Sequence, residues 1–543
     1  MKLTEHTAAP MKLHQAMVFA LTLFLSHCLS SSARPNIIFI FSDDHAAHSI
    51  GAYGASIRPT PNLDQLAQDG AIFLNNFSNN AICCPSRAAV LTGTHSQINQ
   101  VYTNWNGLDP RKNITYPEVL QAAGYQTALF GKWHLKFNPT GYTDWMIFPD
   151  QGDYYNPTYK TAHGHVRHEG YSTDITTNLA IEWLDKQRNP EQPFLLSIQY
   201  KAPHQDYMPG PSELERGDYT HIEFPEPATL LDDYTSRSPA LGNATQFFIQ
   251  NWGGISEHKL TLGQKSAFKS VNKSIGRMNR QQLGIWNQYY ATIATSDSYT
   301  DPLKRTRAIY QRFIKNYYMT VDGIDRNIGR LLHYLEDRSL DENTLIVYSS
   351  DHGYFLGEHG QRGKRWFYEE SARMPLIMRW KEKIAPGTRI EALTQNIDYA
   401  PFFADIAHTS MPKTTQGKSF LRLLSQPLAP RWREAIYYTY FQPNQGVEPH
   451  EGVRTQRYKL IHFYQLNAFE LYDLENDPNE IKNLYGSVQY SNLQTKLKQI
   501  LDQQRSQYNA HSYDTLIREN IEFRTPKETV QSYNSVSYPV KLP

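Results

Sequence analysis

Residues 36–44 read Asn-Ile-Ile-Phe-Ile-Phe-Ser-Asp-Asp, an apolar run that ends in two acids. A continuous apolar run, without the alternation of a half-exposed strand, is typical of a strand buried on both faces of a parallel sheet. Open α/β sheets bind their ligands just past the carboxyl ends of such strands. The stretch therefore predicts a parallel α/β core with Asp43 and Asp44 at the ligand-binding edge.

Further patterns of apolar residues along the chain indicate other strands and helices. Helix 305–338 is indicated by apolar residues at helical spacing, among them Ile309, Phe313 and Tyr317. Alternating strands and helices predict an α/β fold with a large central, mostly parallel sheet flanked by helices. The elements on which this rests are strands at 127–131, 194–200 and 345–349, and helices at 61–69, 174–187 and 305–338.

Changes in composition divide the 543 residues into parts. A chain of this length is too long for one small core, which favours a large domain and a smaller one. Short strands at 435–441, 452–455, 458–464 and 470–473, followed by a helix at 484–508, predict a smaller α+β subdomain with an antiparallel sheet. The predicted parts are 1–33, a signal peptide; 34–430, the main domain, with an insertion beside the site at 208–300; 431–520, the C-terminal subdomain; and 521–543, a tail.

Charge and the amino end bear on partners and location. Lys and Arg total 54 against 53 Asp and Glu, a net charge of +1, which gives no support for a nucleic-acid partner. Lys2 and Lys12 precede an apolar run at 16–25 and a Ser/Ala stretch at 30–33, a pattern typical of a secretory signal. No segment resembles a transmembrane helix. We expect an exported protein, secreted or periplasmic, or lysosomal if the source is eukaryotic.

Cysteine usage singles out one position. Cys28 would leave with the signal, so only Cys83 and Cys84 remain, and a disulfide between adjacent residues is strained. An exported protein that keeps two cysteines without a structural bridge is a candidate for cysteine-based chemistry.

Residues 83–93 read Cys-Cys-Pro-Ser-Arg-Ala-Ala-Val-Leu-Thr-Gly. Counted from Cys83, but not from Cys84, they match C-x-P-S-R-x-x-x-L-T-G, and so resemble the hallmark of the type I sulfatases of the alkaline phosphatase superfamily. The resemblance, which covers about residues 35–505, implies an alkaline phosphatase-like fold with the catalytic domain at 34–430. It also implies that Cys83 is oxidised to formylglycine (3-oxoalanine) by a formylglycine-generating or anaerobic sulfatase-maturating enzyme.

The chemistry explains why such a residue is needed. A serine that attacked sulfur would be left as a sulfate ester, itself hard to hydrolyse. A hydrated aldehyde has two hydroxyls on one carbon: one attacks sulfur to form a formylglycine-sulfate intermediate, and the other then expels sulfate. A helix that starts near Pro85 would direct its positive end at the sulfate.

Two further segments resemble the metal-binding segments of this family. They are Ser42-Asp43-Asp44-His45 and Ser350-Asp351-His352-Gly353. Paired acids at strand ends suit a hard cation, and the resemblance implies one Ca²⁺ per chain. His352 departs from the asparagine common in the family, and nitrogen is an unusual ligand for Ca²⁺. The implied metal residues are Asp43, Asp44, Cys83, Asp351 and His352.

The remaining catalytic positions follow by the same resemblance. Lys132 and Lys364 would bind sulfate, and His134 would assist the formylglycine hydroxyl. His204 would bind sulfate and protonate the leaving alcohol, while Arg87 would brace the formylglycine. Together these side chains would form a cation-lined pocket for charge that develops on oxygen during transfer.

The segments 83–87, 350–360 and 364–370 look most like those of glycan sulfatases, including N-acetylglucosamine-6-sulfatases and enzymes for algal polysaccharides such as ulvan. A sulfated polysaccharide or oligosaccharide is therefore the expected substrate. Two alternatives remain open: a phosphonate or phosphate-ester hydrolase on the same scaffold, and a non-catalytic glycan-binding protein. Candidate sugar contacts, for which ordinary loop packing is the competing interpretation, are Trp105, Asn106, His359, His450 and Arg454.

Overall fold

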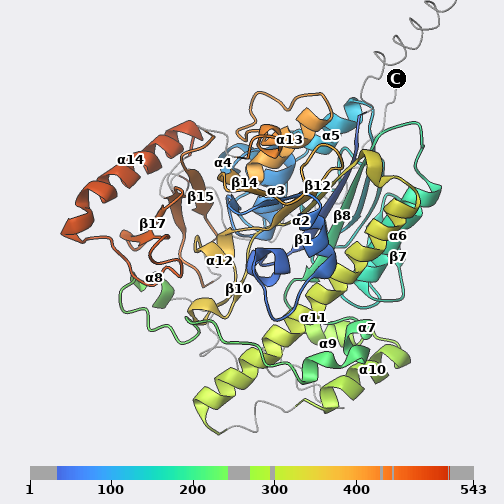
Figure 1. Ribbon diagram of the computed structural model, residues 1–543, viewed down its shortest axis with the longest axis horizontal. Coiled ribbons are helices and arrows are strands. Elements are labelled where there is room, and N and C mark those ends of the chain that lie inside the picture. The colour runs from blue at the N-terminus through green and yellow to red at the C-terminus, as the bar shows by residue number, and fades with distance from the viewer. Residues whose placement is uncertain are drawn as a thin grey trace, which may run out of the picture.

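The computed structural model describes residues 34–242, 269–293, 300–427, 432–442 and 446–510, together with residues 513 and 516 (Figure 1). The predicted signal peptide, Cys28 and the tail at 521–543 lie outside the described residues. In the part that is described, no helix is both long enough and apolar enough to cross a membrane.

A ten-stranded sheet forms the centre of the described chain, in the order β13-β2-β12-β9-β1-β8-β4-β5-β6-β7. Strand β1 lies between β8 and β9 and runs parallel to both, and β4 and β5 extend the parallel part. The predicted large, mostly parallel sheet is thus confirmed. The strands are β1 (Asn36–Asp43), β2 (Ala71–Phe73), β4 (Gln126–Gly131), β5 (Asp144–Ile147), β6 (Thr158–Thr161), β7 (Gly164–Arg167), β8 (Phe194–Pro203), β9 (Thr344–Ser350), β12 (Leu376–Arg379) and β13 (Thr388–Ile390).

Helices cover both faces of this sheet, which is why residues 37–41 of β1 are all apolar. Ile38 and Ile40 pack in a core with α2 (Pro61–Gln68), α6 (Ser172–Lys186) and α11 (Pro302–Asp337). Ile37 and Phe39 pack in a second core with α3 (Cys83–Thr92), α5 (Tyr116–Ala122) and α13 (Tyr399–Ile406). Successive side chains of a strand point to opposite faces, so a strand between two helical layers needs apolar residues throughout.

Short elements complete the main domain. Strand β3 (Asn76–Phe77) pairs with β14 (Thr394–Gln395), and β10 (Phe355–Leu356) pairs with β11 (Arg362–Gly363). The remaining helices are α4 (Ser96–Asn99), α7 (Pro211–Arg216), α8 (Pro239–Gly242), α9 (Lys269–Ile275), α10 (Arg280–Ala291) and α12 (Glu369–Ala372). Within the described part of the predicted insertion, α7 contacts both α10 and the long helix α11 at the lower edge of Figure 1, whereas α8 lies beside the C-terminal sheet.

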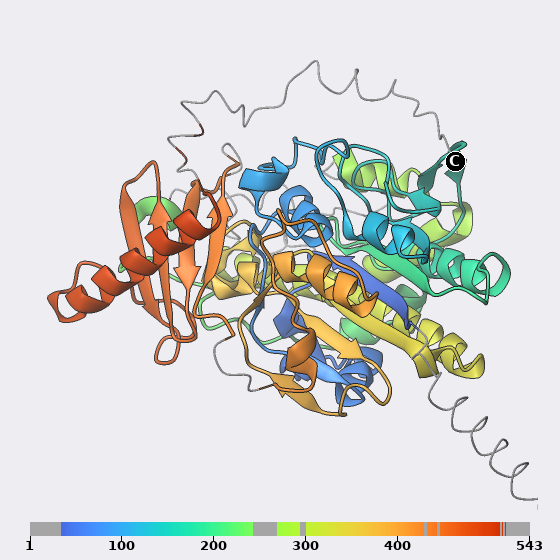
Figure 2. The same cartoon turned by 90° about the horizontal axis from the view of Figure 1, so that it is seen from above.

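The predicted C-terminal antiparallel sheet is confirmed. Its order is β15-β16-β17-β18, and α14 lies across it, as the view in Figure 2 shows. The predicted start of the helix at 484 is wrong, because α14 begins at Ser491. Asn483 Oδ1 accepts hydrogen bonds from the backbone N–H groups of Leu471 and Tyr485, both at 2.9 Å, and Gly486 has φ +85°, so the chain turns first. The elements are β15 (Ile436–Tyr440), β16 (His450–Arg454), β17 (Tyr458–Phe463), β18 (Ala468–Asp473) and α14 (Ser491–Gln507).

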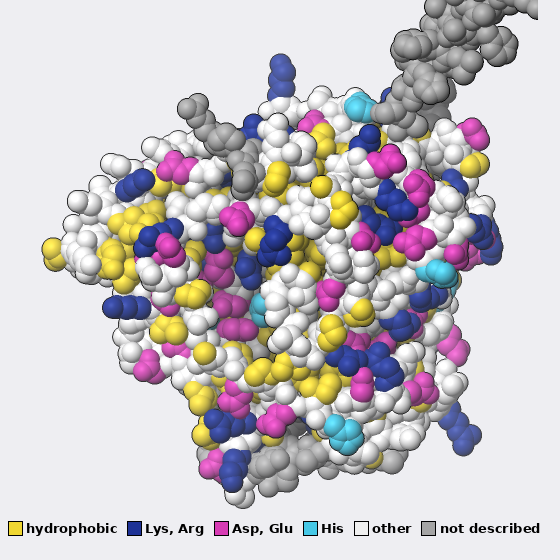
Figure 3. All heavy atoms as spheres, in the orientation of Figure 1, with side chains coloured by type: hydrophobic (Ala, Val, Ile, Leu, Met, Phe, Trp, Pro, Cys, Tyr) yellow, Lys and Arg dark blue, Asp and Glu magenta, His cyan; other side chains and the backbone are white. Residues whose placement is uncertain are grey.

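Acidic and basic side chains are interspersed on the face shown in Figure 3, in keeping with the net charge of +1. This face carries no broad basic surface. On this face, a strong attraction for an anion would have to arise locally.

A buried charge cluster joins the C-terminal sheet to the main domain. Lys459 Nζ on β17 lies 2.9 Å from Glu369 Oε1 and 2.8 Å from Glu480 Oε1. Glu480 also accepts a hydrogen bond of 2.7 Å from the backbone N–H of Glu369, the first residue of α12. Burial is the main cause that raises the pKa of Glu480 to about 7.

This pKa predicts how Glu480→Gln changes the pH dependence of stability. A folded-state pKa above the unfolded value means that the carboxyl contributes most stability at low pH, and that this contribution is lost as the pH rises from about 4.5 to 7. We expect the free energy of unfolding of the parent, relative to Glu480→Gln, to fall by about 1–3 kcal/mol over that range. Denaturant unfolding at pH 5 and 7.5 measures it, with the exposed Glu475→Gln as control. Equal pH slopes for parent and Glu480→Gln would contradict the prediction.

Candidate active site

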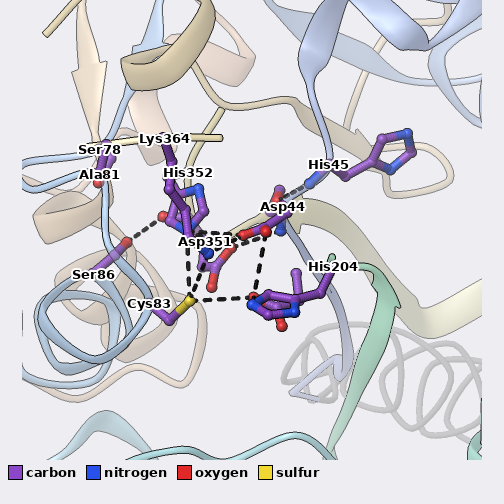
Figure 4. A network of polar contacts seen from close by, with 12 residues as sticks. Asp44, His45, Ser78, Ala81, Cys83, Ser86, His204, Asp351, His352 and Lys364 are labelled. Carbon is purple, nitrogen blue, oxygen red and sulfur yellow. Dashed lines mark hydrogen bonds and ion pairs between the residues drawn. The ribbon is translucent and has the colours of Figure 1, made fainter. Parts of the chain in front are cut away.

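The predicted site residues meet at the carboxyl edge of the parallel strands. Asp43 ends β1, Lys132 follows β4, His204 follows β8 and Asp351 follows β9. The amino end of α3 brings Cys83 to the same place, and Lys364 enters from the hairpin β10–β11. Figure 4 shows Cys83, Asp351, His352, Lys364 and His204 around a common centre.

The end of β1 explains how two consecutive acids face one site. In a regular strand, Asp43 and Asp44 would point to opposite faces. Here the pairing with β8 shifts register between Phe41 and Asp43, and Asp44 has φ +67°. As a result Asp43 Oδ1 lies 3.5 Å from Cys83 Sγ, while Asp44 Oδ1 lies 3.3 Å from His352 Nε2.

The arrangement of donors suits a cation. Ligand atoms of Asp43, Cys83, Asp351 and His352 all lie within 4.8 Å of one another, and all four residues are buried. His352 Nδ1 is 2.8 Å from the carbonyl oxygen of Gly353, which can only accept, so Nε2 keeps its lone pair toward the acids. Burial is the main cause that lowers the pKa of His352, favouring this neutral form.

The carboxylates carry an electrostatic cost that a cation would relieve. Burial raises the pKa of Asp351 to about 7 and, with the charge of Asp43, raises the pKa of Asp44. Burial also opposes ionisation of Asp43, but Lys132, His204 and Arg87 outweigh it and hold the pKa of Asp43 well below its ordinary value. Three buried acids with one neutral imidazole nitrogen fit a hard divalent cation.

The two adjacent cysteines occupy different environments. Burial opposes ionisation of Cys83, yet Lys364 and Lys132 lower the pKa of its thiol to about 5, and Lys364 Nζ lies 3.0 Å from Sγ. Burial raises the pKa of Cys84 to about 12, and its thiol donates to the carbonyl oxygen of Asn106 at 2.9 Å. Cys83 is therefore the cysteine that faces the charged cluster.

Cationic side chains surround the acids. Lys132 pairs with Asp43, and Lys364 pairs with Asp44. Arg87 holds three strand ends together: its Nε donates to Asp351 Oδ2 at 3.2 Å, while Nη1 donates to the Lys132 carbonyl oxygen at 3.1 Å and to Gln199 Oε1 at 2.9 Å. Arg87 thus braces the acid cluster from α3.

Sequence reasoning missed several polar neighbours. Gln151, in the loop after β5, lies against Lys132 and His134, and Gln199 on β8 accepts from Arg87. Lys201 is buried with Nζ 4.8 Å from the Tyr154 ring centre, and burial lowers its pKa. Gln151 and Gln199 do not belong to a recognisable short motif. Lys201 lies in the segment that ends at His204, but the resemblance assigns it no role.

A cavity of about 380 Å³ opens over this cluster. Burial, helped by nearby lysines and opposed by Asp43, lowers the pKa of His204, which lies at the cavity wall with Nε2 3.8 Å from Asp44 Oδ2. Of the candidate sugar contacts, Trp105 lines the cavity. The other lining residues are Asn104, His134, Lys136, Asp150, Gln151, His204, Gln205, Tyr354, Arg362, Gly363, Lys364, Arg365 and Gln442.

The other candidate sugar contacts are not among the residues that line this cavity. Asn106 Oδ1 accepts from the Thr103 hydroxyl at 2.7 Å. His359 is fully buried with Nδ1 2.9 Å from Asp232 Oδ2.

His450 and Arg454 are likewise held by packing. His450 stacks between Trp366 and Tyr438, and burial lowers its pKa to about 4. Arg454 lies over the Phe77 ring and pairs with Glu369 at 3.3 Å. The structure thus brings Trp105 to the cavity but engages His359, His450 and Arg454 elsewhere.

The backbone at the end of β4, just before Lys132, requires a glycine at position 131. It has φ +111°, and a Cβ there would lie 1.9 Å from the carbonyl oxygen of Gln199, which accepts the Lys132 N–H at 2.7 Å. We expect Gly131→Ala to lower the free energy of unfolding by about 2–4 kcal/mol and to displace Lys132. Thermal unfolding and kcat/KM measure both effects.

Gly124→Ala is the matched control. Gly124 precedes the same strand with φ +91°, but a Cβ there meets only Arg34, at 3.9 Å. This variant should lose only about 1 kcal/mol and keep parental activity. Equal stability losses in the two variants would mean that contact with Gln199 is unimportant.

A mostly parallel sheet with buried acids, lysines and a cysteine at its carboxyl edge fits a hydrolase of anionic esters. The sulfatase family profile matches residues 35–409, and the profile described as N-sulphoglucosamine sulphohydrolase, C-terminal, matches residues 357–507. The chain belongs to the sulfatase family, which confirms the class of enzyme predicted from the sequence.

Individual relatives agree with this assignment. The chain is 38% identical over 513 residues to an N-acetylglucosamine-6-O-sulfatase of Bacteroides thetaiotaomicron, covering 92% of this chain and 91% of that protein. It is 25% identical over 484 residues to an ulvan-active sulfatase of Formosa agariphila, covering 86% and 80%. A solved sulfatase in complex with its substrate, D-glucosamine-2-N,6-O-disulfate, superposes with a TM-score of 0.84 at 38% identity, covering 89% of this chain and 99% of that one.

Proposed function

We propose that this sulfatase is exported and removes sulfate from a sulfated glycan, with 6-O-sulfated glucosamine or N-acetylglucosamine as the preferred sugar. The observation that carries the chemistry is the convergence of Cys83, three buried acids and two lysines at one edge of the sheet. The choice of sugar is supported by the 38% identity to an N-acetylglucosamine-6-O-sulfatase across most of both chains.

Two groups would complete the site. Asp43, Asp44, Asp351 and His352 are the residues that would hold Ca²⁺, which supplies positive charge beside the nucleophile. Conversion of Cys83 to formylglycine by a maturating enzyme supplies two hydroxyls on one carbon, one to attack sulfur and one to release sulfate later. Both cysteines are buried, but the Cys83 thiol lies against Asp43 and Lys364, whereas the Cys84 thiol donates to the carbonyl oxygen of Asn106, and this difference supports the assignment.

The chain's own side chains would handle charge and protons. Lys364 Nζ lies 3.0 Å from Cys83 Sγ, and Lys132 also lowers the pKa of this thiol. Both lysines would contact the sulfate oxygens, where negative charge develops. His204 reaches the cavity wall and would give a proton to the departing sugar oxygen. His134 is among the groups that lower the pKa of Cys83 and would take a proton from the nucleophile. Arg87 would keep Asp43 and Asp351 in place.

The substrate proposal predicts a clear ranking in a panel of sulfated compounds. We expect the matured protein to release sulfate from N-acetylglucosamine-6-sulfate and glucosamine-2-N,6-O-disulfate roughly a hundredfold faster, in kcat/KM, than from ulvan oligosaccharides or galactose-6-sulfate. Ion chromatography of free sulfate measures it. Faster release from ulvan oligosaccharides would overturn the choice of sugar but not of reaction.

Two measurements distinguish the proposed function from the alternatives, a phosphonate hydrolase and a non-catalytic glycan-binding protein. A phosphonate monoester hydrolase of Agrobacterium radiobacter shares the fold, with a TM-score of 0.63 at 20% identity. Parallel assays of an aryl sulfate and an aryl phosphonate should favour the sulfate. A mass spectrum of the peptide that contains Cys83 should show the thiol replaced by an aldehyde, and an intact thiol in protein from a host with the maturating enzyme would favour a non-catalytic glycan binder.

A further inference from the structure

A tight turn beside β4 contacts every second side chain of the segment after that strand, at positions 132, 134 and 136. The turn spans residues 148–152 after β5, and the backbone N–H of Phe148 donates to the Gly131 carbonyl oxygen at 2.8 Å. Asp150 has φ +54° and Gly152 has φ +71°, where a Cβ would lie 2.6 Å from the Phe148 ring. Left-handed backbone at two positions, one of them not glycine, is costly and is often kept where a side chain must be presented in one direction.

Gln151, at the tip of this turn, bridges two candidate catalytic residues. Its Oε1 lies 2.6 Å from Lys132 Nζ, and its Nε2 lies 3.1 Å from His134 Nε2. An ammonium group can only donate, so the amide oxygen must face Lys132 and the amide N–H must face His134. One planar amide therefore fixes the relative positions of both side chains.

Asp150 holds the neighbouring groups. Its Oδ1 accepts from Lys136 Nζ at 3.1 Å and lies 3.3 Å from His134 Nε2. The second contact is an ion pair only when the imidazole is protonated, because a neutral ring that accepts the Gln151 N–H at Nε2 has no proton there to donate. Residues 132, 134 and 136, which follow β4, are thus each in contact with the turn, which follows β5. A flexible lysine gains affinity for an anion when its ammonium group is already oriented, because less rotamer entropy is lost on binding.

We propose that Gln151 is a positioning residue of the sulfatase reaction, acting through Lys132 and His134. It directs Lys132 Nζ toward the sulfate oxygens and keeps the His134 ring beside position 83. The proposal rests on the function proposed above, but its contact with Lys132 can be tested by anion binding without turnover.

The test is a double-mutant cycle with inorganic sulfate as the probe. Gln151→Leu, Lys132→Met and the double variant are titrated calorimetrically with sulfate in the presence of Ca²⁺. We expect Gln151→Leu to weaken binding roughly tenfold, and to have no further effect in the Lys132→Met background. Gln126→Leu, an amide at the other end of β4, should bind as the parent does. If Lys132→Met fails to fold, Lys132→Gln replaces it.

Turnover provides the second readout. The kcat of Gln151→Leu for the best sulfated sugar should fall roughly 10- to 100-fold, more than the loss of sulfate affinity, because the His134 contact is lost as well. Sulfate affinity within twofold of the parent, or fold-changes that simply multiply in the double variant, would overturn the proposal. A parent that binds sulfate and shows the coupling, yet hydrolyses no sulfate ester, would overturn the proposed function and leave only the positioning of Lys132 by Gln151 standing.

Discussion

Cys83→Ala should lose at least about 10⁴-fold in kcat/KM for every sulfate ester while the protein stays folded. Alanine cannot be converted to an aldehyde, so the site would lose the atom that attacks sulfur. The cavity and both lysines would remain. We therefore expect sulfate release to fall to background in a steady-state assay, with a thermal unfolding midpoint near that of the parent.

Cys84→Ala is the matched control for this variant. It removes the adjacent buried thiol, whose hydrogen bond to Asn106 is neutral and directed away from the acids. We expect activity within about threefold of the parent and a stability loss of about 1 kcal/mol. If Cys83→Ala turned over substrate as fast as Cys84→Ala does, a nucleophile at position 83 would have to be abandoned.

Asp351→Asn should abolish metal binding and lower kcat/KM by about 10³-fold or more. Asp351 contributes to the candidate cation site, and its Oδ2 also accepts the Arg87 Nε hydrogen bond. The amide is isosteric but neutral, so the site loses one of its negative charges. Elemental analysis should give one Ca²⁺ per chain for the parent and much less for the variant.

Asp325→Asn controls for removal of a buried acid elsewhere. Asp325 on α11 accepts backbone hydrogen bonds from Asn62 and Leu63 at the start of α2, and burial raises its pKa to about 6. This variant should keep its metal and its activity. Removal of the metal from the parent with EGTA should also stop turnover. It should lower the free energy of unfolding by about 3 kcal/mol relative to protein that holds free Ca²⁺ at a hundred times its Kd. Added Ca²⁺ should restore both activity and stability. Full activity of metal-free parent would rule out the proposed cation.

Much of the site could be predicted because its residues lie where regular elements end. Asp43 and Asp351 follow apolar runs after one and two serines, and the carboxyl ends of adjacent parallel strands must meet at one edge. Cys83 and Arg87 lie one turn apart on the same helix, so one short motif specifies their relative positions.

The turn around Gln151 could not be predicted in this way. Gln151 comes close to Lys132 only because β5 pairs with β4, and nothing in the residues near 151 indicates that pairing. The left-handed backbone of Asp150 is equally invisible, since aspartate adopts ordinary conformations in most loops.

The sequence by itself determined the parallel core, the antiparallel C-terminal sheet, the class of enzyme and the cysteine that faces the acids. The two sheets follow from the periodicity of apolar residues, whereas the class of enzyme and the choice of Cys83 follow from the resemblance of residues 83–93 to the sulfatase motif. Both kinds of signal are local properties of the chain. Only the tertiary structure decided which of the candidate sugar contacts reach the cavity. Trp105 lines it, whereas His359 and His450 are enclosed by side chains from distant segments. Whether a histidine is exposed or buried depends on what the rest of the chain packs against it, and that is a sum of long-range contacts with no signature at the residue itself.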